Sequence, residues 1–139
     1  MDVHTPKTRS YNMSQIRAKD TTPEATVRKY LFANGFRYRK NDDKLPGKPD
    51  IVLPKYKTVI FVNGCFWHKH DGCKYFVWPK SNVEFWKQKL LANEARDIKN
   101  NELLHKAGWN VIVIWECELK NNLASQTLKS LLQKIKQNL

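Results

Sequence analysis

The sequence predicts an α/β fold in which a mixed central sheet of about four strands is flanked by helices. Two observations lead to this prediction. Short extended runs alternate with longer helical patterns along the chain, and the continuous apolar run 111–114 is typical of a strand buried on both faces. Because no repeat or linker interrupts the alternation, we expect the 139 residues to form a single domain, 1–139.

The first helix is predicted to start in the segment 21–24, where a threonine serves as N-cap, proline occupies the first turn and glutamate lies near the positive end. It should end at Gly35, a natural left-handed cap. The polar residues 1–20 before it are expected to form an arm that contacts DNA and is mobile without it. Three extended runs follow, and we expect them to be neighbouring strands of one sheet: 36–39, 50–53 and 58–62.

The second half of the chain supplies two further helices and one strand. Ser81 and Glu84 match a capping box, which predicts the start of a long helical stretch that ends before Gly108 and has room for a break inside it. The buried strand is expected at 109–115. Leucine and isoleucine then recur at helical spacing between 128 and 135, which predicts a C-terminal helix packed on the core.

The charge of the chain points to a polyanionic partner. Lysine and arginine number 25 against 13 acidic residues, which gives a formal net charge of +12. Neutralising phosphates releases counterions, so we expect nucleic acid as the partner; a solubilising surface charge is the alternative. An anionic membrane is disfavoured because no basic amphipathic helix is visible. The chain has no apolar run of the roughly 18–20 residues that span a bilayer, and no secretory signal follows Met1. We therefore expect a protein that is cytoplasmic and does not bind a membrane.

The cysteines suggest a metal site. Cys65, His70 and Cys73 fall within nine residues, and Cys117 follows the predicted buried strand, where the fold could return it to the same place. Three cysteines without an export signal disfavour a disulfide framework. Thiolate and imidazole are the ligands of closed, tetrahedral structural zinc sites, so we expect a zinc-stapled loop. The spacing is irregular, and the alternative is that Cys65 and Cys117 are small buried hydrophobes.

Asp50 opens one predicted strand, and the neighbouring strand ends at Val62 and Asn63, just before the cysteine-rich loop. This order is similar to the restriction-endonuclease-like nucleases, in which a carboxylate at the start of one strand and groups on its neighbour hold Mg²⁺ against the scissile phosphate. An ordinary turn aspartate is the alternative interpretation of this short motif taken alone.

Several separated segments together resemble the very short patch repair (Vsr) mismatch endonucleases in order and spacing. Over roughly residues 3–120 they are 8–10, 12–13, 45–50, 59–61, 64–68, 84–86, 94–97, 108–109 and 115–117, of which Gly-Cys-Phe-Trp-His at 64–68 is the most specific. The resemblance implies a restriction-endonuclease-like core. It also implies a strand-specific endonuclease that nicks DNA 5′ of the thymine of a T:G mismatch, left by deamination of 5-methylcytosine.

The resemblance implies a role for individual residues. Asp50 would be the main ligand of a catalytic Mg²⁺, assisted by the backbone carbonyl of Val62. His68 would orient or deprotonate the attacking water, with Glu24 reaching it from the helix N-terminus, because imidazole titrates near neutral pH. Asp97 matches a supporting acidic position.

One residue departs from the family pattern. The family commonly has a second histidine where this chain has Asn63, and an amide can donate to a phosphate but cannot relay a proton. Either His68 and metal-bound water suffice, or activity is reduced. The Glu-x-Lys usual on the second strand of restriction enzymes is also missing here, as the histidine chemistry of the resembled family implies.

The resemblance also implies DNA contacts. Phe66, Trp67 and Trp86 would enter the base stack beside the mismatch, where unstacking is cheapest; core packing is their alternative role. Met13 is expected near the same groove. Arg9, Arg17 and Lys19 are candidate phosphate contacts, with ordinary solvated charges as the alternative.

The expected protein is thus a monomeric enzyme on mismatched double-stranded DNA, with structural zinc and catalytic magnesium. Two alternatives remain open from the sequence. One is a restriction-type endonuclease that cuts both strands of an unmodified site. The other is a zinc-stabilised DNA-binding module that has lost catalysis, which would also explain the charge, the cysteines and Asn63.

Overall fold

The protein is built on a four-stranded mixed sheet, as the sequence predicts. The computed structural model describes residues 22–120 and 122–137. Strand order follows the chain: β1 (Arg39–Lys40), β2 (Ile51–Leu53), β3 (Thr58–Asn63) and β4 (Asn110–Trp115). The first three strands pair antiparallel, and β4 runs parallel to β3. The predicted arm 1–20 lies outside the described residues, and so does Thr21, the first residue of the predicted helix start.

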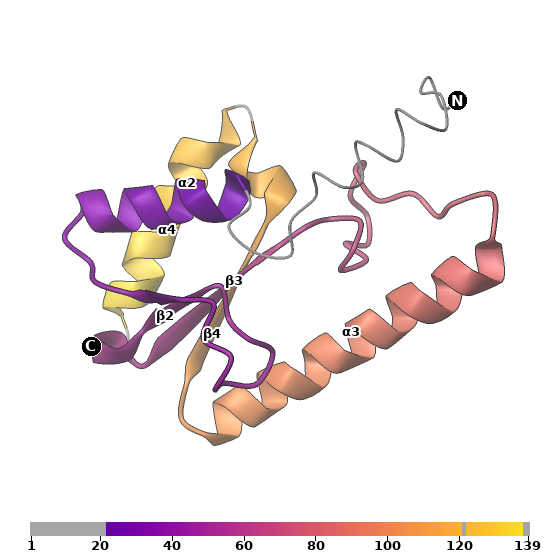
Figure 1. Cartoon of the computed structure of the whole chain (residues 1–139). Coiled ribbons are helices and arrows are strands. Elements are labelled where there is room, and N and C mark those ends of the chain that lie inside the picture. The colour runs from indigo at the N-terminus through magenta and orange to yellow at the C-terminus, as the bar shows by residue number, and fades with distance from the viewer. Residues whose placement is uncertain (1–21, 121, 138–139) are drawn as a thin grey trace.

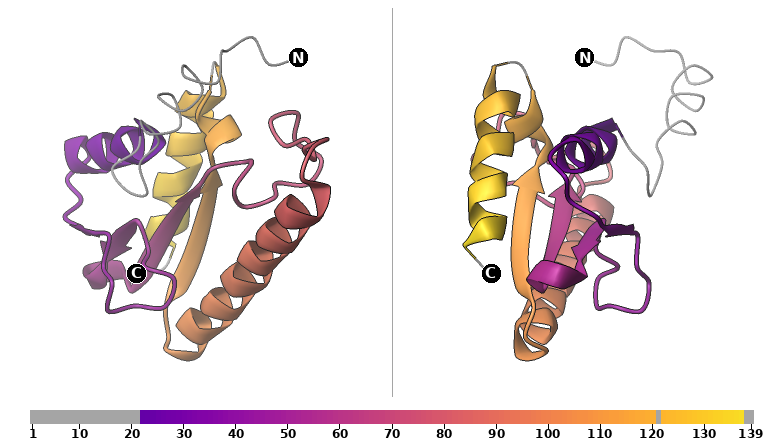
Figure 2. Two further views of the ribbon diagram at one scale, coloured as in Figure 1. Left: turned by 45° about the vertical axis from the view of Figure 1, so that its right-hand side comes forward. Right: turned by 90° about the vertical axis from the view of Figure 1, so that its left-hand side faces the viewer.

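Helices cover both faces of the sheet (Figures 1 and 2). Helix α2 (Thr22–Ala33) and helix α4 (Leu123–Lys136) pack on one face, and the long α3 (Val83–Lys106) crosses the other. Short 3-10 helices follow β2 and β4, at Pro54–Tyr56 (η1) and Glu116–Leu119 (η2). In the described part of the chain, no helix combines the length and the apolarity needed to cross a membrane.

The main core lies between the sheet and the pair α2 and α4. Alternate residues of β3 and β4, among them Ile60 and Ile112, meet Leu31 of α2 and Leu131 of α4 there. The predicted C-terminal helix face is confirmed. On the α3 side the buried cluster is small and consists of Val52, Val59 and Leu104, with partly buried residues around it.

Two sequence predictions are corrected, and the possibility of a break in the long helix is settled. β4 is not buried on both faces, since Val111 and Val113 stay partly exposed where α3 contributes few buried side chains. The capping box does not form: α3 is capped by Asn82, in a left-handed conformation, so Glu84 is one position too early to complete the box. The helix also runs unbroken from Val83 to Lys106.

The first strand is shorter and later than predicted. Gly35 does end α2, with a positive φ of 86°. Phe36 then turns into the core, where it is 4% exposed. Only Arg39 and Lys40 pair with β2, opposite Val52 and Ile51, so the residues between Phe36 and Arg39 lead from the core to the sheet without joining a strand.

Candidate active site and metal centre

The cysteine-rich loop, residues 64–73, is called the metal loop below, and it is anchored by the parallel pair β3 and β4. Asn63 is the Cα partner of Trp115, so both strands end at the same edge of the sheet. Cys65 follows β3 directly, and Cys117 lies just past β4 in η2. This register explains how two cysteines far apart in sequence reach one place.

The predicted zinc ligands do come together. One ligand atom from each of Cys65, His70, Cys73 and Cys117 lies within 4.8 Å of all the others. The Sγ of Cys117 is 3.6 Å from Nδ1 of His70, and the imidazole stacks on Trp115 at a centroid distance of 3.9 Å and an interplanar angle of 2°. All three cysteines are free thiols.

The electrostatics of this cluster favour a cation. Burial raises the pKa of the Cys65 thiol, and burial followed by the neighbouring thiols raises the pKa of Cys117 to about 12. The backbone N–H of Tyr75 donates to Cys73 and lowers its pKa. A divalent metal binds the thiolate form, so it would offset the cost of ionising the crowded Cys65 and Cys117 thiols. The donor set therefore fits a tetrahedral metal centre.

Asp50 forms the second chemical centre, at the start of β2. Its Oδ2 accepts a hydrogen bond of 2.6 Å from the backbone N–H of Val62. Burial, and then the neighbouring carboxylate of Glu24, raises the pKa of Asp50 to about 7 against the lowering effect of that N–H. A buried carboxyl group, Glu24, beside the partly buried one of Asp50 is costly without a cation. Oxygen ligands of this kind suit Mg²⁺, so the site fits a hard divalent ion.

His68 is held by a carboxylate from α3. Its Nδ1 lies 2.7 Å from Oδ2 of Asp97, and the two side chains are 32% and 36% exposed. Because a carboxylate can only accept, Nδ1 carries the proton in this contact, and in the neutral ring Nε2 is the acceptor. His68 also lies close enough to Asp50 that its protonated form lowers the pKa of that carboxyl. The arrangement can orient or deprotonate a water molecule.

A small cavity of about 50 Å³ joins three of the predicted catalytic residues, since Asn63, His68 and Asp97 all line it. Asn63 is only 8% exposed. The cavity is closed at one side by Gly47, where a Cβ would approach the side chains of Asn100 and Phe61 to 3.1–3.2 Å. Gly47 also has a positive φ of 77°, so a side chain there would be strained twice over.

The three predicted wedge residues form one aromatic cluster beside the metal loop. Ring centroids are 5.3 Å apart for Phe66 and Trp67, 5.4 Å for Phe66 and Trp86, and 5.8 Å for Trp67 and Trp86. All three rings are partly buried, and neighbouring Phe85 is 58% exposed. The cluster therefore belongs to the surface rather than to either core.

Some residues near the site were missed from the sequence. Arg28 is 12% exposed, and its guanidinium lies 3.4 Å from the Glu24 carboxylate, which the spacing of four residues could have indicated. Asn100 and Asn101 line the cavity, one helical turn after Asp97. The predicted DNA contacts Met13, Arg9, Arg17 and Lys19 lie outside the described residues.

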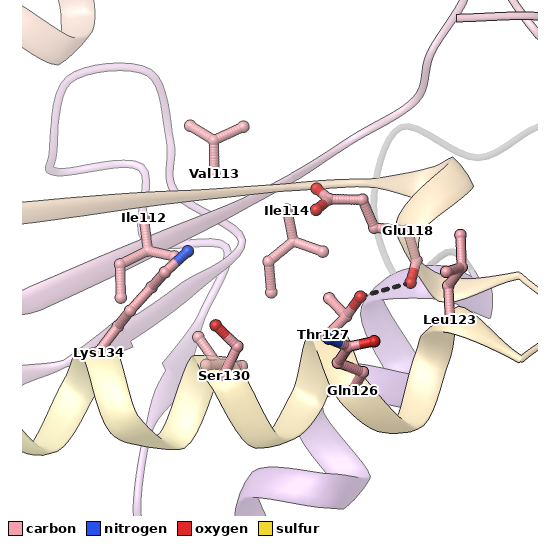
Figure 3. A pocket seen from close by; sticks show the side chains of 10 residues that line it. Ile112, Val113, Ile114, Glu118, Leu123, Gln126, Thr127, Ser130 and Lys134 are labelled. Carbon is pink, nitrogen blue, oxygen red and sulfur yellow. Dashed lines mark hydrogen bonds between the residues drawn. The ribbon is translucent and has the colours of Figure 1, made fainter.

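A larger cavity of about 290 Å³ lies elsewhere, between β4 and α4 (Figure 3). Ile112 and Ile114 face Thr127, Ser130 and Lys134 of the helix across it. Thr127 donates to the backbone carbonyl of Glu118 at 2.8 Å, as the dashed line marks. None of the predicted site residues lines this cavity, so size alone does not locate the chemistry.

A mixed sheet flanked by helices, with an acidic group at the start of one strand and further groups at the end of its neighbour, is the architecture of the restriction-endonuclease-like enzymes. Comparison with known proteins narrows this class to one family. A family model described as DNA mismatch endonuclease Vsr matches residues 1–74. The chain belongs to this family. It is accordingly a DNA endonuclease, with a Cys/His group that could hold a metal ion.

Three curated relatives illustrate the similarity. The "Type II nicking enzyme V.NmeAIP" of Neisseria meningitidis serogroup A is 53% identical over 97% of this chain and 96% of its own length. The "Type II nicking enzyme V.XorIIP" of Xanthomonas oryzae pv. oryzae is 46% identical over 86% of this chain and 88% of its own. The "DNA mismatch endonuclease Vsr" of Escherichia coli is 42% identical over 86% and 76%.

Proposed function

We propose that this protein nicks one strand of duplex DNA on the 5′ side of the thymine of a T:G mismatch, using Mg²⁺ held at Asp50. The observation that carries the proposal is the pairing of two centres at one sheet edge. Asp50 lies against β3 with a raised pKa, and the imidazole of His68 is fixed by Asp97 next to it. Metal-dependent hydrolysis of a phosphodiester requires these two elements.

The roles of the residues follow from their contacts. Asp50, with the backbone carbonyl of Val62, would hold Mg²⁺, which when bound supplies charge for the phosphate and acidifies its water. His68 would accept the proton of the attacking water at Nε2, because Nδ1 is committed to Asp97. Asn63 would donate to the phosphate or to Asp97 within the shared cavity. Glu24 would support Asp50 and His68, with its own charge balanced by Arg28.

The aromatic cluster would select the mismatch. Phe66, Trp67 and Trp86 would enter the base stack as wedges, and unstacking costs a few kcal/mol per step, least where pairing is already defective. Partial exposure of all three rings supports this role over core packing. Met13, Arg9, Arg17 and Lys19 are proposed to add groove and phosphate contacts.

Nicking is favoured over cutting of both strands by the nature of the relatives, two of which are called nicking enzymes. We propose that the protein acts in the cytoplasm as a monomer of one domain, 1–139. Its structural zinc would be held by Cys65, His70, Cys73 and Cys117, whose donor atoms all lie within 4.8 Å of one another.

The test is a cleavage panel. Duplexes that carry each single mismatch, with the two strands labelled differently, are incubated with the zinc-loaded protein and Mg²⁺. The expected product is a single nick 5′ of the thymine in the T:G duplex. Cleavage of both strands of a fully paired site would replace this proposal with the restriction-type activity.

The matched control for the panel is Asp50→Ala, which should abolish nicking and leave mismatch binding within a few-fold of wild type. Chemistry and recognition would then be separated, because the carboxylate holds the metal and lies outside the aromatic cluster. Near-normal nicking by this variant would mean that the catalytic metal lies elsewhere.

A further inference from the structure

One turn of α3 grips three consecutive residues of the metal loop. The side chain of Asn93 donates to the backbone carbonyl of Trp67 at 3.2 Å, Asp97 holds the ring of His68 at 2.7 Å, and Glu94 accepts from Nζ of Lys69 at 3.1 Å. Positions 93, 94 and 97 share one face of a helix. The same helix carries Trp86, which contacts Trp67 two turns earlier.

Lys69 is unusual among these residues. It lies between His68 and the metal-site residue His70, its backbone is left-handed with a φ of 50°, and its side chain is only 12% exposed. A bulky residue enters that conformation at a cost and stays there only when its surroundings hold it. Nζ is engaged by two carboxylates, Glu94 on the helix and Asp71 within the loop at 2.8 Å. It is therefore committed to the protein rather than offered to a phosphate.

We propose that the Lys69–Glu94 ion pair is a positioning pair that locks the metal loop onto α3, so that Trp67 and His68 are placed in register for mismatch contact and hydrolysis together. The inference rests on the proposed function of His68 and goes beyond it, since neither Lys69 nor Glu94 touches the reacting atoms. Because one helical turn holds both residues, Trp67 in the base stack and His68 at the attacking water would keep a fixed position relative to each other. Misplacement of a catalytic group by about 1 Å can lower a rate by about a hundredfold.

The chain offers a closely matched comparison for testing the pair. Glu94→Gln removes the charge that joins loop to helix, whereas Asp71→Asn removes an equal charge whose contacts with Lys69, at 3.0 and 2.8 Å against 3.1 Å for Glu94, stay inside the loop. Single-turnover nicking of the T:G duplex at saturating protein should fall by about ten- to a hundredfold in Glu94→Gln and in Lys69→Met. Asp71→Asn, Lys69→Arg and Glu94→Asp should stay within about threefold of wild type.

The dissociation constant of the mismatched duplex separates positioning from phosphate binding. A positioning pair predicts slow chemistry in both Lys69→Met and Glu94→Gln, with affinities for the mismatched duplex that lie within about threefold of each other because both variants release the same contact. A phosphate contact predicts weaker binding in Lys69→Met alone, because Glu94→Gln removes a negative charge and would not weaken DNA binding. That second pattern would overturn the proposal.

An activity-independent measurement covers the remaining cases. In the free, zinc-loaded protein, the hydrogen-bonded Nδ1–H of His68 should exchange with water at least about tenfold faster in Glu94→Gln than in Asp71→Asn, as followed by NMR. Equal exchange rates of this proton in the two variants would overturn the proposed positioning role. Absence of cleavage by the wild-type protein would instead overturn the proposed function, and the exchange measurement would still test the ion pair. If Lys69→Met fails to fold, the Glu94→Gln and Asp71→Asn pair still decides.

Discussion

At the scale of single residues, the surroundings that would suit Asp50 to catalysis also make the stability of the folded protein depend on pH. In the proposed mechanism Asp50 binds a metal ion in a half-buried site next to Glu24, and the same surroundings raise its pKa to about 7. A folded-state pKa above the unfolded value of 3.8 means that the folded protein holds the proton more tightly. The stabilisation is therefore complete below about pH 4 and is lost as pH rises through 7.

The first prediction concerns this loss. Without Mg²⁺, the free energy of unfolding of the zinc-loaded wild type should fall by about 2 kcal/mol more than that of Asp50→Asn between pH 5.5 and pH 8, since each unit of pKa shift is worth about 1.4 kcal/mol. Urea melts at a series of pH values measure the difference. Saturating Mg²⁺ should remove it by binding the ionised form. Parallel pH profiles for the two proteins would show that Asp50 titrates normally.

The second prediction concerns His68 and Asn63, which line the same cavity with different chemistry. His68→Ala should slow single-turnover nicking by roughly 10²–10⁴, the usual loss when general acid–base help is removed. Asn63→Ala should cost about threefold to tenfold, since one hydrogen bond contributes about 0.5–1.5 kcal/mol. Asn63→His, the residue common in the family, should keep or raise the rate provided that Asp97 can pair with it.

Equal loss of activity in Asn63→Ala and His68→Ala would contradict this ranking and give the amide a direct catalytic role.

The ranking rests on contacts that single-residue patterns could not supply. The sequence marks His68 and Asp97 as chemically interesting, but their spacing of 29 residues does not reveal a 2.7 Å contact.

At the scale of elements, predictions based on local physics succeed and those that need a partner fail. Gly35 ends α2 as its backbone freedom requires, and the apolar spacing of α4 buries Leu131 and Ile135. Strand β1 was misplaced because Phe36 packs in the core and only Arg39 and Lys40 pair with β2, which the extended pattern alone does not show. The capping box failed since the position of Asn82, fixed by the preceding loop, decides which residue is the cap.

The third prediction belongs to helix α3 and its aromatic end. Trp86→Ala should lower the preference for a T:G over a fully paired duplex by about 1–3 kcal/mol in binding, the scale of one lost stacking contact. Phe32→Ala is the control, because this ring is 58% exposed on α2 and contacts Arg37 instead of the aromatic cluster. Competition binding with the two duplexes gives the difference. Equal preference in both variants would assign Trp86 to packing.

At the scale of the whole molecule, the Cys/His group that could hold a metal connects parts that are remote in sequence. The metal loop supplies Cys65, His70 and Cys73, and η2 supplies Cys117. The sequence predicts these ligands, but only the parallel register of β3 and β4 explains why they meet. The two faces of the sheet were likewise unpredictable in detail, since a continuous apolar run does not say how much of it α3 will cover.

The fourth prediction tests the centre as a structural one. Purified protein should contain about one zinc ion per chain, and His70→Ala should lose it together with more than about 4 kcal/mol of stability, the range of the largest single-residue effects, to which loss of a metal belongs. His105→Ala is the matched control, because this exposed histidine lies in the last turn of α3. Metal analysis and thermal melts give both readouts. Full stability without zinc would remove the metal from the fold.

The parallel pairing of β3 and β4 also shapes how the chain reaches its native state. Pairing two parallel strands that are joined through a 24-residue helix requires closure of a long loop before any contact rewards it, and such non-local contacts slow folding. His70 and Cys117 are 47 residues apart, so a complete ligand set exists only after this closure. Tight metal binding therefore follows the correct pairing of β3 with β4. A chain that has not yet reached this stage exposes the unpaired edges of both strands and is prone to aggregate.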